Sequence, residues 1–426
     1  MTHYHTDMIW AIDRGLFILC LALAAGILLY AAAKESLSGK KARKMKLVGK
    51  NLHRLIFQGR KDGGPEELAW IGKLEPFDFL ELLKNEKKSV SGDVAEKLRR
   101  YFSEAVDFPK IVAMARGSGN KWRRIEALIS LGYVGGEEAL EILRAALKDK
   151  DGDVAYFSMI AMGKIRTPES ARILLAGIGD RVFDGNRVIS LLESFPPFVI
   201  DEAVAALGHP DPMTRFWAVK LLMIFRPQDL SKKVEPLASD DSPQVRAAAC
   251  ECLGKMGVRG SAEAVRLRLH DPVWFVRRRA IKALSRLEGA ECIPEIAGFL
   301  ADENVMVRDG VKKAMAHDIA ASLPYIERGL QEGPLSLKKD YVEVVETSGY
   351  LSVLFSDLLF GEAPVRDKAR SLLKGMLGSG AHVGIESLLS GFEKETREKI
   401  LGEIAGIDPG RAEHISQKIA HLMEEI

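Results

Sequence analysis

The chain has 426 residues, of which 47% are hydrophobic and 28% charged, so it can bury a large core. Lysine and arginine number 61 against 59 aspartates and glutamates, and the net charge of +2 excludes a whole-chain positive field of the kind that attracts nucleic acid. The four cysteines, Cys20, Cys250, Cys252 and Cys292, lack the paired spacing of a zinc site. We expect them to be reduced thiols of a cytosolic body.

The first element is an uncharged apolar segment at residues 16–33. As a helix it would rise roughly 27 Å, which nearly matches the hydrocarbon core of a bilayer at about 30 Å. Trp10 and Tyr30 would then lie near opposite interfaces of the membrane. The segment therefore predicts a single transmembrane helix.

A cleaved signal peptide is the alternative for this segment, because Ala31 and Ala33 form an A-x-A pattern. A signal peptide has a positive segment ahead of its apolar run, however, and here Asp7 and Asp13 stand against only Arg14. The charges favour an anchor that is retained.

Residues 34–62 are rich in lysine and arginine. The positive-inside rule predicts that this segment and everything after it lie in the cytoplasm, with residues 1–15 outside and the anchor in the inner membrane. The residues expected at the membrane interface are Trp10, Tyr30, Lys40, Lys41, Arg43, Lys44 and Lys46. Apolar residues also recur here at helical spacing, so the segment is either a short helix on an anionic leaflet or a solvated linker.

A repeat follows. The register mark is a basic residue that returns every 28 to 31 residues in most units, with other residues in two of them. The column is Arg124, Ala155, Asn186, Arg215, Arg246, Arg277, Arg308, Lys338, Arg366 and Arg397. Each mark lies in an apolar-periodic stretch, which is followed in many units by a glycine-containing or polar break and a shorter apolar stretch such as Ile293 to Leu300. Each unit therefore reads as helix, turn, helix.

Several units open on an acidic residue, often with proline close behind it. Asp211, Asp241, Asp271 and Asp302 stand in this position, which is typical of a helix N-cap. We therefore expect each of these carboxylates to cap the first helix of its unit.

A period near 31 with two helices and no strand pattern predicts an all-α fold, an α-solenoid in which each hairpin stacks on its neighbours. The pattern DPxxxVRxxAxxAL, carried by Asp271, Pro272, Val276, Arg277, Ala280, Ala283 and Leu284, resembles the short bacterial HEAT-like repeat, which is also known from phycobilisome lyases. The resemblance implies about ten HEAT-like hairpins over residues 120–426. It also implies that Arg277 bonds an acidic residue of an adjacent unit.

Two parts of the chain depart from this register. Residues 63–119 have a helical pattern and are expected to form an N-terminal cap on the stack. The unit that contains Asn186 and the FPPF segment, Phe195 to Phe198, matches the repeat weakly and is expected to mark a bend.

A group of cations around Arg277 is the candidate interaction site. Arg278 and Arg279 project differently from Arg277, and other cations on the same helix and on the one before it could join them. The proposed patch is Arg266, Arg268, Arg278, Arg279, Lys282 and Arg286. A solvated helix face is the alternative. Aromatic residues near the patch are limited to Trp274 and Phe275, so nucleic acid is not an expected partner.

No motif for chemistry is present. The sequence contains no G-x-x-x-x-G-K-[ST], no H-E-x-x-H, and none of the His-Glu pairs that HEAT-like di-iron hydroxylases carry. His3 and His5 are too few for a metal site. We predict no catalytic, cofactor-binding or metal-binding residues.

Together these features predict a membrane-anchored cytoplasmic scaffold or adaptor, not an enzyme, whose HEAT-like repeats bind a protein of a bacterial membrane complex. Two alternatives stay open beside it. One is a lyase-like or other enzyme subunit with a site on the concave face, or a regulatory subunit of a membrane glycosyltransferase. The other is a binder of nucleic acid or lipid that uses the basic face.

Overall fold

The structure is a computed structural model that describes residues 108–117, 119–179, 184–380 and 383–424. Every regular element in these ranges is an α-helix or a 3-10 helix, which confirms the all-α prediction. The chain divides into two compact units, Met1–Ser170 and Ala171–Ile426, and each is described by itself.

The described part of the first unit is a small group of packed helices. Their bounds are α5 Phe108–Gly117, α6 Lys121–Val134, α7 Glu137–Ala146, α8 Gly152–Ile165 and α9 Pro168–Gly179, and the division between the units falls within α9. Helices α6 and α8 pack side by side, while α5 and α7 pack on α6. Asn120 caps α6 by accepting hydrogen bonds from the amides of Trp122 and Arg123.

The second unit continues the alternation of longer and shorter helices. Its elements after α9 are α10 Gly185–Leu192, α11 Val199–Ala206, α12 Pro212–Phe225, η2 Gln228–Leu230, α13 Ser231–Val234, η3 Glu235–Ser239, α14 Pro243–Met256, η4 Arg259–Ser261, α15 Ala262–Arg266, α16 Trp274–Glu288, η5 Gly289–Cys292, α17 Ile293–Ile296, η6 Ala297–Ala301, α18 Val305–His317, α19 Ile319–Glu332, α20 Leu335–Ser348, α21 Tyr350–Phe360, α22 Ala363–Gly378, α23 Val383–Ser390, α24 Lys394–Ile407 and α25 Pro409–Glu424.

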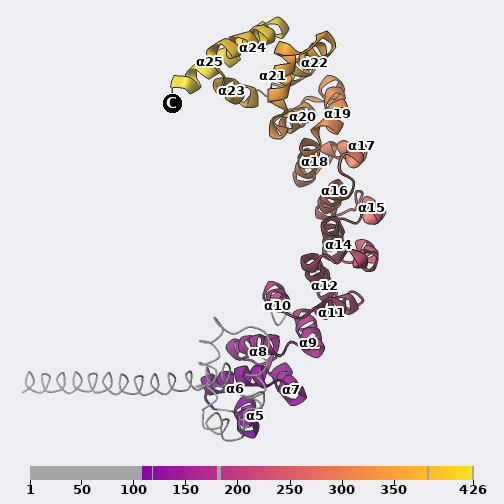
Figure 1. The fold of residues 1–426 in the computed structure, drawn as a ribbon, viewed down its shortest axis with the longest axis vertical. Coiled ribbons are helices and arrows are strands. Elements are labelled where there is room, and N and C mark those ends of the chain that lie inside the picture. Colours follow the sequence, from indigo (N-terminus) through magenta and orange to yellow (C-terminus); the bar gives the residue numbers. More distant parts are fainter. Residues whose placement is uncertain (1–107, 118, 180–183, 381–382, 425–426) are drawn as a thin grey trace, which may run out of the picture. The chain divides into compact units, whose positions relative to one another are not determined.

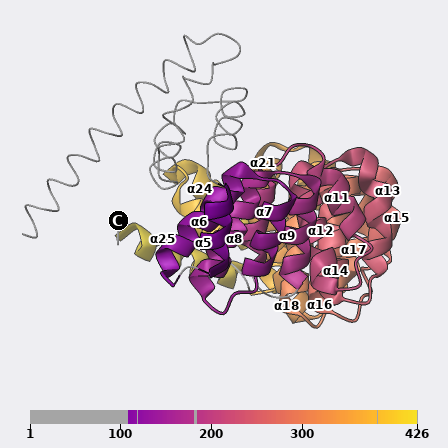
Figure 2. The ribbon, with the colours of Figure 1, turned by 90° about the horizontal axis from the view of Figure 1, so that it is seen from below.

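These helices form pairs that stack on one another, as an α-solenoid requires. From α10 to α25 they make eight hairpins, each with an even-numbered first helix and a second helix that 3-10 turns extend in the middle repeats. In the second unit, α12, α14, α16 and α18 pack directly on one another in chain order (Figure 1). We call this row the first-helix layer. Helices α13 and α15 lie outside it, at the rim of the unit (Figure 2).

A small residue allows two neighbouring first helices to approach closely. Gly254 of α14 faces Ala283 of α16, and a Cβ atom built on Gly254 would lie 2.7 Å from the Ala283 Cα. Gly132 of α6 approaches Ala161 of α8 in the same way. Each of the two glycines lies eight residues after the register mark of its repeat, Arg124 or Arg246. Any larger residue at Gly254 would push the two helices apart.

The prediction that the opening aspartates cap the first helices holds at one position only. Asp211 accepts a hydrogen bond from the amide of Thr214 and caps α12. The prediction is wrong for Asp241, Asp271 and Asp302, because the residue before α14, α16 or α18 is Ser242, Val273 or Asn304. The three aspartates lie one or two residues before the cap position, too far from the free amides of the first turn.

The unit that matches the repeat weakly has short helices. Helix α10 has eight residues, and the ring of Trp217 in α12 lies against Gly185 at its start. The rings of Phe195 and Phe198 meet edge to face at 6.2 Å, and Phe195 is buried. This aromatic pair packs the turn between α10 and α11, and the bend expected here remains a prediction.

The predicted membrane segment lies outside the described residues, as do residues 34–62 and the interface residues. Within the ranges that the structure does describe, no helix combines the length and the apolar character needed to cross a bilayer. Of the predicted cap at residues 63–119, the described part is essentially α5.

Candidate functional site

A chain of arginines and aspartates joins the successive hairpins of the second unit. Arg246 of α14 donates from Nε and Nη2 to the two carboxylate oxygens of Asp271, at 2.7 and 2.9 Å. Two pairs repeat this geometry at the same spacing of 25 residues, Arg215 with Asp240 and Arg277 with Asp302. We call these three pairs the Arg–Asp ladder. Each rung connects a first helix to the turn that leads into the next first helix.

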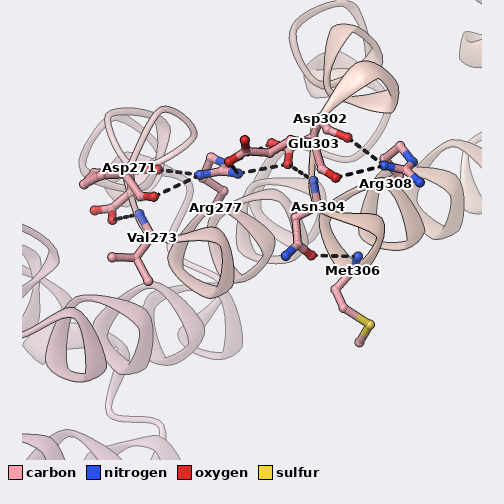
Figure 3. A network of polar contacts seen from close by, with 9 residues as sticks. Asp271, Val273, Arg277, Asp302, Glu303, Asn304, Met306 and Arg308 are labelled. Carbon is pink, nitrogen blue, oxygen red and sulfur yellow. Dashed lines mark hydrogen bonds and ion pairs between the residues drawn. The ribbon is translucent and has the colours of Figure 1, made fainter.

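The remaining nitrogen of each arginine fixes the turn before its own helix. Arg277 Nη1 donates to the carbonyl oxygens of Asp271 and Pro272, and Arg308 binds those of Asp302 and Glu303 in the same way (Figure 3). Each aspartate in turn accepts the amide two residues later, as Asp271 does from Val273. The guanidinium therefore holds two turns at once, which sets the register of neighbouring repeats.

The ion pairs of the ladder are largely buried. The Asp271 side chain is 1% exposed and that of Arg246 12% exposed. Burial alone raises the pKa of Asp271, but the hydrogen bonds from Arg246 and from the Val273 amide outweigh it and lower the pKa below its ordinary value. The carboxylate is therefore ionised at neutral pH. The expectation that Arg277 bonds an acidic residue of an adjacent repeat is confirmed.

The ladder ends where its residue types change. At the position 25 residues after Arg308 stands Gly333, and Arg308 reaches Asp340 of α20 at 3.7 Å. At the other end His209 takes the place of an aspartate, and its Nδ1 accepts the amide of Asp211. In the first unit Arg124 and Asp149 form one further pair at 2.7 Å.

The outward face of α16 carries four of the six cations predicted as an interaction patch. Arg279 pairs with Glu251 of α14 at 2.9 Å, and Arg278 lies 3.5 Å from Asp309 of α18. Lys282 and Arg286, one turn apart and both exposed, have no carboxylate within ion-pair distance in the described part of the chain. Both side chains are therefore available to an external anion.

The other two predicted cations do not join this face. Arg266 binds Glu263, Glu288 and Glu295, at 2.8 to 2.9 Å, and these hydrogen bonds raise its pKa. Arg268 lies near Asp271, and its Nε is buried without a hydrogen-bond partner among the residues described. Both residues belong to the packing between repeats. An interaction role for the patch remains a prediction.

Two cations that sequence reasoning missed extend the α16 face. Lys255 of α14 and Lys313 of α18 each lie 31 residues from a member of the group, Arg286 and Lys282 respectively. The repeat step alone could have found them. We define the basic surface as Lys255, Arg278, Arg279, Lys282, Arg286 and Lys313.

The basic surface holds more positive than negative charge. Its six cations are matched by two carboxylates, Glu251 and Asp309. Burial alone raises the pKa of Glu251, but Lys220, Arg279 and Lys255 together lower it. Arg286, partial burial and Arg279 in turn lower the pKa of Lys282. The cations around Lys282 thus repel one another, and a bound anion would relieve that repulsion.

The described residues offer little sign of a reaction centre. No group of three or more His, Cys, Asp and Glu side chains that could hold a metal ion occurs within residues 108–117, 119–179, 184–380 and 383–424. An open cavity of about 300 Å³ in the first unit is lined by Arg116, Arg124, Glu141, Ile142 and three alanines. Arg116 and Arg124 each have a carboxylate partner, Glu138 and Asp149.

The described cysteines are expected to resist modification in the folded protein. Cys250, Cys252 and Cys292 are free, at most 1% exposed, and burial raises the pKa of each to about 12. A shift from 9.0 to about 12 lowers the thiolate fraction about a thousandfold at pH 8. Peptide mass spectrometry after iodoacetamide should find all three unmodified in the native protein and modified in urea. Rapid native alkylation at any of them would contradict this burial.

The comparisons with known proteins agree with the repeat architecture. The HEAT_2 family of HEAT repeats matches residues 108–193 and 230–316. Both segments are therefore HEAT repeats, as the resemblance implied. Residues 194–229, between the two matches, contain the FPPF segment, Phe195 to Phe198. Among curated proteins, none matches this chain in sequence.

Several solved structures are similar to this one in fold. Kap121p is 14% identical with a TM-score of 0.39, covering 91% of this chain, which spans about half (51%) of Kap121p. The CpcE–CpcF complex of phycocyanin lyase from Nostoc sp. PCC7120 is 16% identical with a TM-score of 0.28, covering 64% of this chain and 96% of that one. Human deoxyhypusine hydroxylase is 17% identical with a TM-score of 0.27, covering 66% and 98%. This chain therefore has HEAT repeats at residues 108–193 and 230–316, and every regular element of its described residues is helical.

Proposed function

We propose that this protein is a scaffold that binds another protein along its first-helix layer, while residues 16–33 tether it to the inner face of a bacterial membrane. The observation that carries the proposal is the Arg–Asp ladder. It holds α12, α14, α16 and α18 in a fixed register, so that equivalent surface positions recur every 31 residues. A rigid row of this kind suits recognition of an extended partner surface.

The charges on the layer support an external partner. Most cations at the contacts between repeats pair with carboxylates of this chain. Arg266, for example, pairs with three glutamates. Lys282 and Arg286 are the exception on α16, since no described carboxylate pairs with them. Uncompensated surface charge speeds and orients the encounter with a partner of opposite charge.

The membrane tether of this proposal rests on the apolar segment 16–33 and the basic segment 34–62. Tethering would confine the repeats to the inner face of the membrane and raise their effective concentration toward a membrane partner. Protease added outside intact cells should then spare the repeats. Digestion of the bulk of the chain would contradict this topology.

The scaffold role is tested by photo-crosslinking in cells. A photoreactive amino acid is placed at position 286 in the first-helix layer. In a matched chain it replaces the exposed Lys233 of α13, which lies outside this layer. We expect a discrete covalent adduct with one protein from position 286 and none from position 233. The same protein should co-purify with the full chain, in stoichiometric amount, from detergent-solubilised membranes.

Two results would overturn the scaffold role. One is the absence of any protein adduct from either position together with the absence of a stoichiometric partner. The other is co-purification of a small molecule that the chain converts to a product, which would assign the protein to the enzyme subunits considered above.

A further inference from the structure

The basic surface crosses three neighbouring helices at a regular step. Lys255 lies on α14, Lys282 and Arg286 on α16, and Lys313 on α18, and these helices pack on one another in order. Adjacent packed helices lie about 10 Å apart. The surface therefore presents cations on three successive helices at about that spacing, with one on α14, four on α16 and one on α18.

An extended polypeptide matches this step. In the polyproline II conformation it advances about 3.1 Å per residue with three residues per turn, so every third side chain points to the same side and lies about 9 Å further on. A chain of this kind that crosses α14, α16 and α18 would thus turn one side chain toward each successive helix at every third residue. Side chains at those positions could each reach a cation of one helix.

The surface already binds carboxylates in the way that such a partner would. Glu251 lies within ion-pair distance of Lys220, Lys255 and Arg279 at once. Asp309 lies between Arg278 and Lys313. These pairs show that the spacing of the cations fits single carboxylates, and Lys282 and Arg286 are left for one more.

A carboxylate-bearing partner fits better than a polyanion. Base stacking requires aromatic side chains, and the positions of α14 and α18 that correspond to Arg278 and Arg279 hold Ala247, Ala248, Asp309 and Gly310. The two native carboxylates, Glu251 and Asp309, also interrupt the positive charge, so the surface suits separate negative charges better than a continuous row of phosphates.

We propose that the basic surface formed by Lys255, Arg278, Arg279, Lys282, Arg286 and Lys313 docks an acidic segment of the partner protein in the extended polyproline II conformation, with carboxylates about three residues apart. The proposal rests on the proposed function and names the chemistry of its partner. Lys282 and Arg286 form the centre of the contact, flanked by Lys255 and Lys313. Salt should weaken the complex, because the side chains involved are exposed.

The test uses the full chain in detergent and a fluorescent peptide of about twelve residues with glutamate at every third position, followed by anisotropy at low ionic strength. We expect the double variant Lys282→Glu with Arg286→Glu to bind on the order of tenfold or more weakly, since attraction becomes repulsion. The matched control is Lys232→Glu with Lys233→Glu, which changes the net charge equally on exposed residues of α13 and should bind as the native chain does.

Further probes separate the alternatives. A peptide with glutamine in place of glutamate should not bind, and a peptide with its glutamates contiguous should bind more weakly. Equal binding of the contiguous peptide would overturn the spacing. Poly(U) RNA and phosphatidylserine vesicles are tested in parallel. The proposal would be overturned if the native chain bound the RNA or the vesicles but not the peptide, and the double variant lost that binding.

The two proposals can fail separately. If the photo-crosslinked partner binds the double variant as tightly as the native chain, the scaffold role stands and the acidic docking surface is wrong. If no partner is captured, but the peptide binds the native chain and not the double variant, the scaffold role is wrong and the acidic docking surface stands.

Discussion

Replacement of Asp271 by alanine is expected to lower the free energy of unfolding of the repeats around it by about 3–5 kcal/mol. The change leaves the Arg246 guanidinium, 12% exposed, without the carboxylate that neutralises it. It also removes the acceptor for the Val273 amide. The loss should show as a lower urea midpoint and as hydrogen exchange roughly a hundredfold or more faster in α14 and α16.

The matched control removes an ion pair between repeats that is exposed. Arg259 and Glu291 are 60% and 68% exposed, so water already screens their attraction. The Glu291→Gln chain should therefore unfold at the native urea concentration. A similar small effect of Asp271→Ala would mean that the ladder does not hold the repeats together. Replacing Arg246 and Asp271 together by apolar residues should restore part of the loss, because no charge is left buried alone.

Replacement of Gly254 by alanine is expected to destabilise the protein by about 1–3 kcal/mol, although alanine favours helices. The added Cβ would lie 2.7 Å from the backbone Cα of Ala283 and 2.8 Å from its side chain, so α14 and α16 must separate. Urea unfolding followed by circular dichroism measures the change. Separation of these helices would also strain the rung between Arg246 and Asp271.

Gly402 provides the opposite case within the same fold. It lies in the interior of α24, is exposed, and has no atom near the place of a Cβ. Gly402→Ala should therefore stabilise the chain, by about 0.5–1 kcal/mol, through helix propensity alone. If both alanine variants changed stability in the same direction, the close approach at Gly254 would not be the cause.

Only part of the basic surface can be predicted from neighbouring positions in the sequence. Arg278, Arg279, Lys282 and Arg286 share one helix, so helical periodicity alone groups them. Arg266 is close in sequence to this group, but in the structure it is surrounded by glutamates of other elements. Lys255 and Lys313 are 31 residues from the group and join it, because stacking brings equivalent positions of successive repeats together.

The sequence by itself determined the all-helical fold and the hairpin period, because both depend on local spacing that recurs along the chain. The structural role of Arg277 was implied by the resemblance of its pattern to HEAT-like repeats. Only the tertiary structure decided that Asp271 and Asp302 bind the arginine of the preceding repeat instead of capping their own helices. It also decided which cations stay unpaired. A carboxylate 25 residues away in sequence becomes a partner only when two hairpins stack, and the start of each first helix relative to its aspartate, which places Val273 or Asn304 at the cap position, is likewise seen only in the folded chain.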